Sequence, residues 1–250
     1  MDDLALLLET IREAGALALR IRKQGFKAWR KPDGTLVTEA DIAVDALLKE
    51  KICAARPGDG WLSEESPDTA ERLGKPRLWI TDPIDGTRAF ADGTRFWGIG
   101  VALTEGGAPL MSAIFCPDDD VLYHAVKGGG AFRNGVALTS PASSGPVILP
   151  RTAQAAVQTL GLPTQVSSNW PMLLRFALIA EGQNPGYIAM GSKQDWDIAA
   201  GVLMVTETGG IVSTAKGAAL RFNTPEHTQP GLVAAQQKWH HPLITAVGHF

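Results

Sequence analysis

Apolar residues recur at helical spacing in two segments near the start of the chain. In the first segment these residues are Leu4, Leu7, Leu8, Ile11, Leu17 and Ile21. This spacing predicts an amphipathic helix over residues 4–21. Thr38 begins a second predicted helix, which runs to about Ala55 and ends at Arg56-Pro57-Gly58. The segment Lys31-Pro32-Asp33-Gly34, between the two helices, predicts a turn.

Shorter apolar runs, separated by Gly, Pro and Asp clusters, predict strands in the next part of the chain. Two of them lie at residues 61–62 and 78–81. Three more, at 96–103, 110–115 and 121–126, follow one another closely enough to form consecutive antiparallel strands.

Helices and strands continue to alternate towards the C-terminus. We expect strands at 147–149, 187–190 and 233–235, and helices at 152–160, 172–181, 197–208 and from about Pro242 onward. This alternation predicts an α+β protein with layered elements. The small, polar segment Ser140–Gly145 marks the predicted boundary between an N-terminal lobe, residues 1–140, and a C-terminal lobe, residues 146–250.

Composition excludes several classes of partner. The chain of 250 residues is 45% hydrophobic and 20% charged with a net charge of −3, so charge gives no reason to expect nucleic acid or a membrane surface as a partner. The acidic start Met1-Asp2-Asp3-Leu4 does not resemble a signal peptide, and no apolar run is long enough to span a bilayer. Two cysteines without motif spacing favour reduced thiols in a cytoplasmic protein.

The segment from Asp82 to Thr87 carries the strongest chemical signal. Asp82 and Asp85 flank Pro83-Ile84, and Gly86-Thr87 follow at once, so an apolar strand ends in a corner that positions two carboxylates. The same dipeptides also form ordinary β-turns. As hard oxygen ligands, the carboxylates and the Ile84 carbonyl suit Mg²⁺ or Mn²⁺.

Other acidic residues lie where layered folds assemble sites, at predicted strand ends and helix starts. Asp41 follows Thr38 at the spacing of a capping box, so it has a structural interpretation as well. Glu64-Glu65 could be solvated loop charge, and Asp195 or Asp197 could cap the helix that begins there.

Five motifs, in order, resemble those of the inositol monophosphatase family of lithium-sensitive, magnesium-dependent phosphomonoesterases. They are Val37-Thr38-Glu39-Ala40-Asp41, Leu62-Ser63-Glu64-Glu65-Ser66, Asp82-Pro83-Ile84-Asp85-Gly86-Thr87, Trp196-Asp197-Ile198-Ala199-Ala200-Gly201 and Glu207-Thr208-Gly209-Gly210. The resemblance extends over nearly the whole chain and implies a layered αβαβα sandwich.

The resemblance also implies roles for the site residues. Glu64, Asp82 and the Ile84 carbonyl would hold a first Mg²⁺, and Asp82, Asp85 and Asp197 a second. Glu65 would support these ligands or a third ion, and Mn²⁺ is a possible substitute. Asp41 and Thr87 would position and deprotonate the attacking water, with Glu64 as a further catalytic residue. The backbone amides of Gly86 and Thr87 would bind phosphate oxygens.

The identity of the phosphate ester depends on finer resemblances. The segments Leu62–Glu65 and Arg175–Gly182 are similar to the bacterial 3'(2'),5'-bisphosphate nucleotidase branch, so adenosine 3',5'-bisphosphate, hydrolysed to AMP, is the first expectation. Lys193 and Arg175 are candidate ligands for its second phosphate, although both could be solvated surface charges. Inositol 1-phosphate is the second expectation. Histidinol phosphate is the third, because Asp85–Phe90 and Trp97-Gly98 resemble the histidinol-phosphate phosphatases.

A non-catalytic homologue that binds metal or phosphate is the alternative from a different class. It is disfavoured because Asp41, Glu64, Asp82, Asp85, Thr87 and Asp197 are all present. The family resemblance also implies a homodimer.

Overall fold

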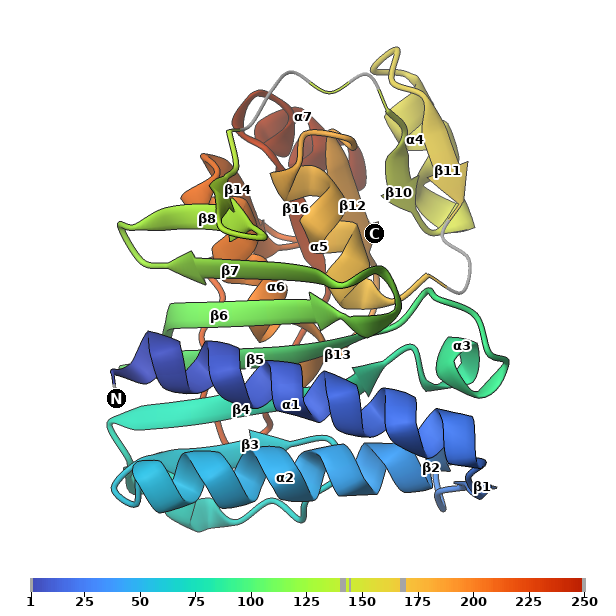
Figure 1. The fold of residues 1–250 in the computed structure, drawn as a ribbon. Helices are drawn as coiled ribbons and strands as arrows, with labels where there is room; N and C mark the ends of the chain where they lie inside the picture. The colour runs from blue at the N-terminus through green and yellow to red at the C-terminus, as the bar shows by residue number, and fades with distance from the viewer. Residues whose placement is uncertain (1, 140–142, 144, 167–169, 249–250) are drawn as a thin grey trace.

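Two β-sheets alternate with three groups of helices through the molecule (Figure 1). The computed structural model describes residues 2–139, 143, 145–166 and 170–248. Its α-helices are α1 Asp3–Gln24, α2 Glu39–Ala55, α3 Thr87–Ala91, α4 Gln154–Gln158, α5 Met172–Ala180, α6 Asp195–Glu207 and α7 Gln237–Val247. Short 3₁₀ turns lie at Ala70–Gly74, Pro117–Asp119 and Arg151–Ala153.

The larger sheet has seven strands in chain order. They are β3 Gly60–Ser63, β4 Arg77–Asp85, β5 Gly98–Glu105, β6 Ala108–Cys116, β7 Val121–Val126, β8 Gly130–Arg133 and β9 Val136–Ala137. Strands β3 and β4 run parallel, and every later pair is antiparallel. The predicted meander at residues 96–126 is therefore confirmed.

The smaller sheet has five strands in the order β11-β10-β12-β16-β14. Their bounds are β10 Val147–Leu149, β11 Thr164–Val166, β12 Gly186–Ala189, β14 Gly210–Thr214 and β16 Leu232–Gln236. The remaining strands form two separate two-stranded antiparallel sheets. One pairs β1 Ala28–Arg30 with β2 Leu36–Thr38, and the other pairs β13 Lys193–Gln194 with β15 Thr228–Gln229.

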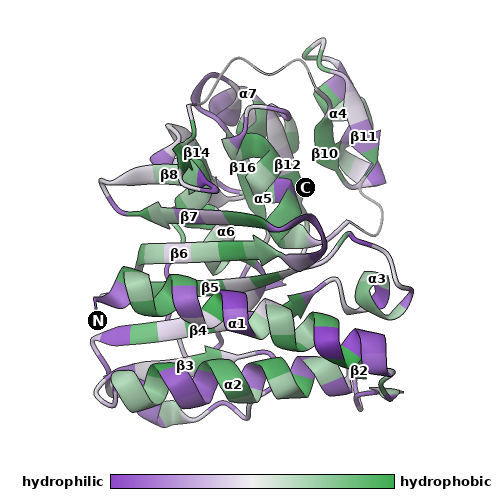
Figure 2. Cartoon of the chain, viewed as in Figure 1, coloured by the Kyte–Doolittle hydropathy of each residue, from purple (hydrophilic) through white to green (hydrophobic). Residues whose placement is uncertain are grey.

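Side-chain alternation along the strands explains the layers. On β4, Trp79 packs in a core with α1 and α2, whereas Leu78 and Ile80 point to the opposite face and pack in a core with α5 and α6. Helix α1 carries hydrophilic and hydrophobic residues in alternation, as expected for a helix with one face against a sheet (Figure 2).

Helices α5 and α6 form the central layer. Their core contains Ile114 of the larger sheet together with Tyr187 and Ala234 of the smaller one. On the far side of the smaller sheet, α4 and α7 cover a third core. The order of layers is therefore α, β, α, β, α, and the predicted αβαβα sandwich is confirmed.

Several element boundaries differ from the sequence-based expectation. Strand β4 was expected to end at Thr81 but continues to Asp85, because its pairing with β5 resumes after an irregularity. Helix α7 was expected from about Pro242 but begins at Gln237, so the proline lies inside it and removes one backbone donor. The hairpin β1–β2 was predicted only as a turn.

The predicted lobe boundary Ser140–Gly145 falls largely on residues 140–142 and 144, which lie outside the described residues. All strands of the larger sheet precede it in sequence, and all strands of the smaller sheet follow it. The division into two lobes stays a prediction, since the central core contains residues from both halves of the chain. Among the helices described, none is long and apolar enough to cross a membrane.

Candidate active site

Parallel pairing of β3 and β4 brings the first two acids together. Ser63 of β3 lies opposite Thr81 of β4, so Glu64 and Asp82 are the next residues at the same edge of the sheet. The sequence pattern could predict two strand ends with acids but could not predict that the two strands are neighbours. Because the two strands are parallel and in this register, carboxylates that are far apart in the sequence lie at the same edge of the sheet.

A β-bulge shapes the corner that follows. Asp82 pairs with Gly100 and Asp85 with Gly98, so two residues of β4, Pro83 and Ile84, lie opposite one residue of β5. Next, Gly86 adopts the left-handed conformation, with φ 94° and ψ 38°. A β-carbon there would lie 2.8 Å from Pro171 Cγ and 3.0 Å from Phe96 O, so both the backbone angle and the space favour glycine.

Asp82 is almost completely buried, at 1% exposure, as is Asp41. Burial, together with the charges of Asp85, Glu64 and Asp197, raises its pKa well above the ordinary value. Its Oδ1 atom is buried without a hydrogen-bond partner in the described structure. An unpaired buried carboxylate oxygen is costly, so a cation bound at this atom would stabilise the site.

Asp85 and Asp197 come from different layers and face the same cleft. Burial raises the pKa of Asp85 to about 6, although the Leu173 and Met172 amides and the Arg175 charge act in the opposite direction. The Leu173 amide donates to Asp85 Oδ2 at 2.6 Å, which ties the corner to the start of α5. Burial and the charges of Asp85 and Glu64 raise the pKa of Asp197, in the first turn of α6, to about 7.

Asp41 caps helix α2 and also contacts Thr87 at the corner of β4. Its Oδ2 atom accepts hydrogen bonds from the Thr38 amide at 2.9 Å and from the Thr38 hydroxyl. The Asp41 amide in turn donates to Thr38 Oγ1 at 3.4 Å, which completes the capping box of α2. Its Oδ1 atom lies 3.0 Å from Thr87 Oγ1, which is also 3.1 Å from the Ile84 carbonyl oxygen. Burial raises the pKa of Asp41, although the hydrogen bonds to Thr38 and Thr87 partly offset this effect.

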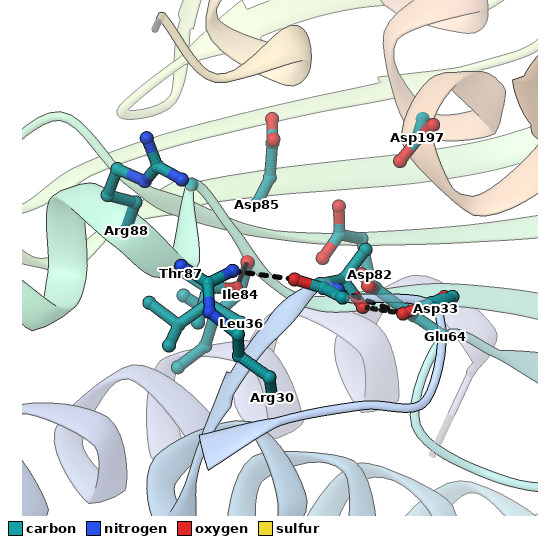
Figure 3. Close-up of a pocket in the computed structure, with 13 residues that line it drawn as sticks. Arg30, Asp33, Leu36, Glu64, Asp82, Ile84, Asp85, Thr87, Arg88 and Asp197 are labelled. Atoms are coloured by element: carbon teal, nitrogen blue, oxygen red, sulfur yellow. Dashed lines mark hydrogen bonds between the residues drawn. The ribbon is translucent and has the colours of Figure 1, made fainter. Parts of the chain in front are cut away.

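These elements enclose a cleft of about 480 Å³ (Figure 3). Its lining consists of Arg30, Asp33, Gly34, Thr35, Leu36, Glu64, Asp82, Ile84, Asp85, Gly86, Thr87, Arg88 and Asp197. Sequence reasoning missed Arg30, Arg88 and the hairpin residues. A signal was available for Arg88, which directly follows Thr87, but the fold of the hairpin over the cleft could not be predicted from a turn motif alone.

Lys31 was also missed. Its ammonium group lies 2.7 Å from Glu65 Oε1 and 3.2 Å from Glu64 Oε1. Burial raises the pKa of Glu65 to about 7, with the Glu64 charge adding to the effect and Lys31 opposing it. Glu65 does not line the cleft, so the structure places it behind Glu64 and in contact with Lys31.

The two predicted cationic contacts, Lys193 and Arg175, do not line the cleft. Arg175 is buried, where it donates to the Tyr187 hydroxyl at 2.9 Å and to the Trp170 carbonyl. Lys193 donates to the Ser192 carbonyl at 3.2 Å. Both charges still influence the acids from a distance. The Arg175 charge partly offsets the raised pKa of Asp85, and the Lys193 charge partly offsets the raised pKa of Asp197.

The donor set fits a hard divalent cation. Within the described part of the chain, no three His, Cys, Asp or Glu side chains are arranged as a ready-made metal site. Nevertheless, five carboxylates and Ile84 line one cleft, and the Asp82 Oδ1 atom lacks a hydrogen-bond partner among the described residues. Oxygen donors of this kind suit Mg²⁺ or Mn²⁺.

The fold and the site define a class of protein: a layered α+β enzyme whose acidic cleft lies where strand ends meet helix starts. The family model for the inositol monophosphatase family matches residues 3–249. The chain belongs to the inositol monophosphatase family, and it is a hydrolase of phosphate monoesters.

Known relatives differ in their substrates. A histidinol-phosphatase of Chlorobaculum parvum is 32% identical over 99% of this chain and 97% of its own length. A 3'-phosphoadenosine 5'-phosphate phosphatase of Mycobacterium leprae is 32% identical over 93% of this chain and 89% of its own. A solved IMPase/NADP phosphatase, complexed with Mg²⁺ and phosphate, has a similar fold with a TM-score of 0.84 at 22% identity, covering 97% of this chain and 93% of that one.

Proposed function

We propose that the protein hydrolyses a small phosphorylated metabolite with Mg²⁺ bound in the acidic cleft. Glu64, Asp82 and the Ile84 carbonyl would hold one ion, and Asp82, Asp85 and Asp197 a second. When bound, the metal supplies positive charge that offsets the charge of the phosphate and lowers the pKa of water. The observation that carries the proposal is the buried, unpaired Asp82 at the centre of this acid set.

The chain's own residues provide a path for the proton of the attacking water. Thr87 Oγ1 accepts this proton while its own hydroxyl proton passes to Asp41 Oδ1, 3.0 Å away. Burial raises the pKa of Asp41, which makes it a stronger base than an exposed aspartate. Water attacks phosphorus directly, the bond from phosphorus to the ester oxygen breaks, and this oxygen takes up a proton from solvent water and leaves as an alcohol. No covalent intermediate with the protein is needed.

Adenosine 3',5'-bisphosphate, hydrolysed to AMP, is our proposed substrate. The supporting observation is that two guanidinium groups, of Arg30 and Arg88, line the cleft beside the carboxylates. Because guanidinium groups bind phosphate well, they would hold the phosphate that is not cleaved. They replace Lys193 and Arg175 as candidates for this contact. The M. leprae relative acts on this compound according to its name.

Histidinol phosphate is the second candidate. The C. parvum histidinol-phosphatase matches this chain over almost its full length. In addition, the exposed Asp33 carboxylate lies in the cleft lining, where it could contact a cationic substrate.

The first experiment measures phosphate release from adenosine 3',5'-bisphosphate, histidinol phosphate and inositol 1-phosphate, with Mg²⁺ and with or without Li⁺. We expect Mg²⁺-dependent release, inhibited by Li⁺, with the highest kcat/KM for the bisphosphate. If kcat/KM is highest for histidinol phosphate, that ester becomes the proposed substrate instead of the bisphosphate. If no ester releases phosphate, the result favours a non-catalytic homologue.

The variant Arg88→Ala tests how the substrate is recognised. We expect its KM for the bisphosphate to rise about tenfold while its KM for inositol 1-phosphate stays nearly constant, because one charged contact is worth about 1.4 kcal/mol. Arg20→Ala, at an exposed position on α1, is the matched control. An equal change of KM for both esters would contradict a role in binding a second phosphate.

Homodimer formation and a cytoplasmic location stay predictions.

A further inference from the structure

The hairpin β1–β2 covers one side of the acidic cleft. Arg30 on β1, Leu36 on β2 and the turn residues 33–35 belong to the cleft lining, and Figure 3 shows Arg30, Asp33 and Leu36 opposite the corner of β4. The hairpin has three paired residues on each strand, and β1 is fully exposed. A two-stranded ribbon of this size has little stability of its own, so contacts with the rest of the protein must hold it in place.

Lys31 provides such a contact from the turn of the hairpin to the end of β3. Its ammonium group lies between the two glutamates, 2.7 Å from Glu65 Oε1, 3.2 Å from Glu64 Oε1 and 3.5 Å from the Glu64 carbonyl oxygen. The side chains of Lys31 and Glu64 are 21% and 25% exposed, and that of Glu65 is 4% exposed. Ion pairs of this kind are screened less than pairs on an open surface.

The same glutamate is a proposed ligand of the first metal ion. Glu64 has one negative charge, and an ammonium group and a divalent cation at its carboxylate repel each other. Contact with Lys31 and ligation of a metal therefore compete for Glu64. Glu65 does not face the cleft, so it can keep Lys31 when Glu64 turns to a metal.

We propose that Lys31 is a positioning residue: its ion pairs with Glu64 and Glu65 hold the β1–β2 hairpin over the cleft in the metal-free protein, and metal binding at Glu64 competes with it. The inference rests on the metal site of the proposed function. The ammonium group of Lys31 is a cation supplied by the chain itself. Its contact with Glu64 weakens metal binding and couples metal binding to the position of the hairpin.

Calorimetric titration of the full-length chain with MnCl₂ or MgCl₂, without substrate, tests the competition. We expect Lys31→Met to bind metal about three- to thirtyfold more tightly than the wild type, the range that corresponds to a partly exposed ion pair. Lys31→Arg keeps the charge and should bind metal about as the wild type does. Lys27→Met, with its exposed side chain just before the same hairpin, is the control for a lost charge.

Hydrogen–deuterium exchange of the metal-free proteins tests the link to the hairpin independently. Amides of residues 28–38 should exchange faster in Lys31→Met than in Lys27→Met, and the two variants should agree elsewhere. Adding Mn²⁺ to the wild type should speed exchange at these residues less than Lys31→Met does, because only the pair with Glu64 is lost and Glu65 keeps its pair with Lys31.

The two measurements distinguish failure of this proposal from failure of the metal site. Equal or weaker metal binding by Lys31→Met, compared with Lys27→Met, would overturn the competition. Unchanged exchange at residues 28–38 would overturn the positioning role. If the wild type binds no metal at all, the proposed metal site is wrong and the competition falls with it, while the exchange data alone still support or overturn the role of Lys31 in holding the hairpin.

Discussion

Asp82 combines deep burial with an oxygen atom that has no hydrogen-bond partner among the described residues. A residue that only stabilised the fold would be expected to have paired oxygens in this position. Its pKa is raised by burial first and by three neighbouring acids next, so its negative charge opposes folding in the absence of a cation.

The variant Asp82→Asn separates these two effects. We expect kcat/KM for phosphate release to fall by at least about 10²-fold, because a charge at the reacting centre is lost. The melting temperature of the metal-free variant should nevertheless equal or exceed that of the wild type. Enzyme kinetics and calorimetry measure the two quantities, with the exposed Asp92→Asn as the control. Activity close to that of the wild type would contradict the proposed metal site.

Thr87 is expected to act through its hydroxyl group alone. Its Oγ1 atom lies within hydrogen-bond distance of Asp41 Oδ1 and of the Ile84 carbonyl. Thr87→Ser keeps the hydroxyl and should retain kcat within a few-fold, whereas Thr87→Val should lower kcat by about 10²-fold, the contribution typical of general acid–base catalysis. Single-turnover kinetics at saturating substrate provides the measurement. Equal losses in the two variants would indicate that packing of the side chain, rather than proton transfer, is what matters.

At the scale of elements, contacts between α5 and α6 determine the distance between two of the proposed ligands. The Leu173 amide of α5 holds Asp85, and Asp197 lies in the first turn of α6. The helices approach closely at Gly201 of α6, where an added β-carbon would lie 2.4 Å from Phe176 Cγ. Phe176 is fully buried, so it has little room to move.

Gly201→Ala should therefore destabilise the protein by about 1–3 kcal/mol, even though alanine favours helix. The affinity of the variant for Mg²⁺ should also fall, because α6, which carries Asp197, must shift. Urea unfolding and calorimetric titration measure the two effects, and Thr206→Ala, at an exposed position of the same helix, is the control. Unchanged stability would show that the two helices can separate without cost.

The same elements show what the sequence could and could not predict. Hydrophobic periodicity was sufficient for α1 and α2, which have one face on a core. Continuous apolar runs were sufficient for strands β5 to β7, which have a core on each face. The acids of the site were found from their motifs. The hairpin contacts of Arg30 and Lys31 were not, because they depend on how a short polar segment packs against distant elements. Arg175 was taken for a surface charge or a phosphate ligand because a sequence does not show that a lone arginine is buried against Tyr187.

At the scale of the whole molecule, acids from three layers lie in or beside one cleft, and their mutual repulsion opposes folding. Glu64 and Asp82 come from the edge of the larger sheet, Asp41 from the outer helix layer and Asp197 from the central helix layer. The pKa is about 6 for Asp85 and about 7 for both Asp197 and Glu65, which are all raised above the ordinary values of these groups.

These raised values predict how stability depends on pH. An acid whose pKa is higher in the folded state binds its proton more tightly there, so folding is favoured as the pH falls through the folded-state pKa. Above about pH 8, one unit above the highest of these values, these acids are ionised in both states, and the full cost of repulsion is present. Between about pH 8 and pH 5 this cost is progressively removed, so the metal-free protein should become more stable as the solution is acidified.

We therefore expect the melting temperature of the protein in EDTA to be at least about 3 °C higher at pH 5.5 than at pH 8.0, a shift that corresponds to roughly 1 kcal/mol for a protein of this size. With excess Mg²⁺ at pH 8.0 the order should reverse, because a cation that binds only the folded state stabilises it and prefers ionised ligands. Differential scanning calorimetry at the two pH values, with EDTA or with Mg²⁺, gives all four melting temperatures. In Asp82→Asn both the effect of acid and the effect of Mg²⁺ should shrink. A metal-free protein that is most stable at pH 8.0 would show that other charges outweigh those of the cleft.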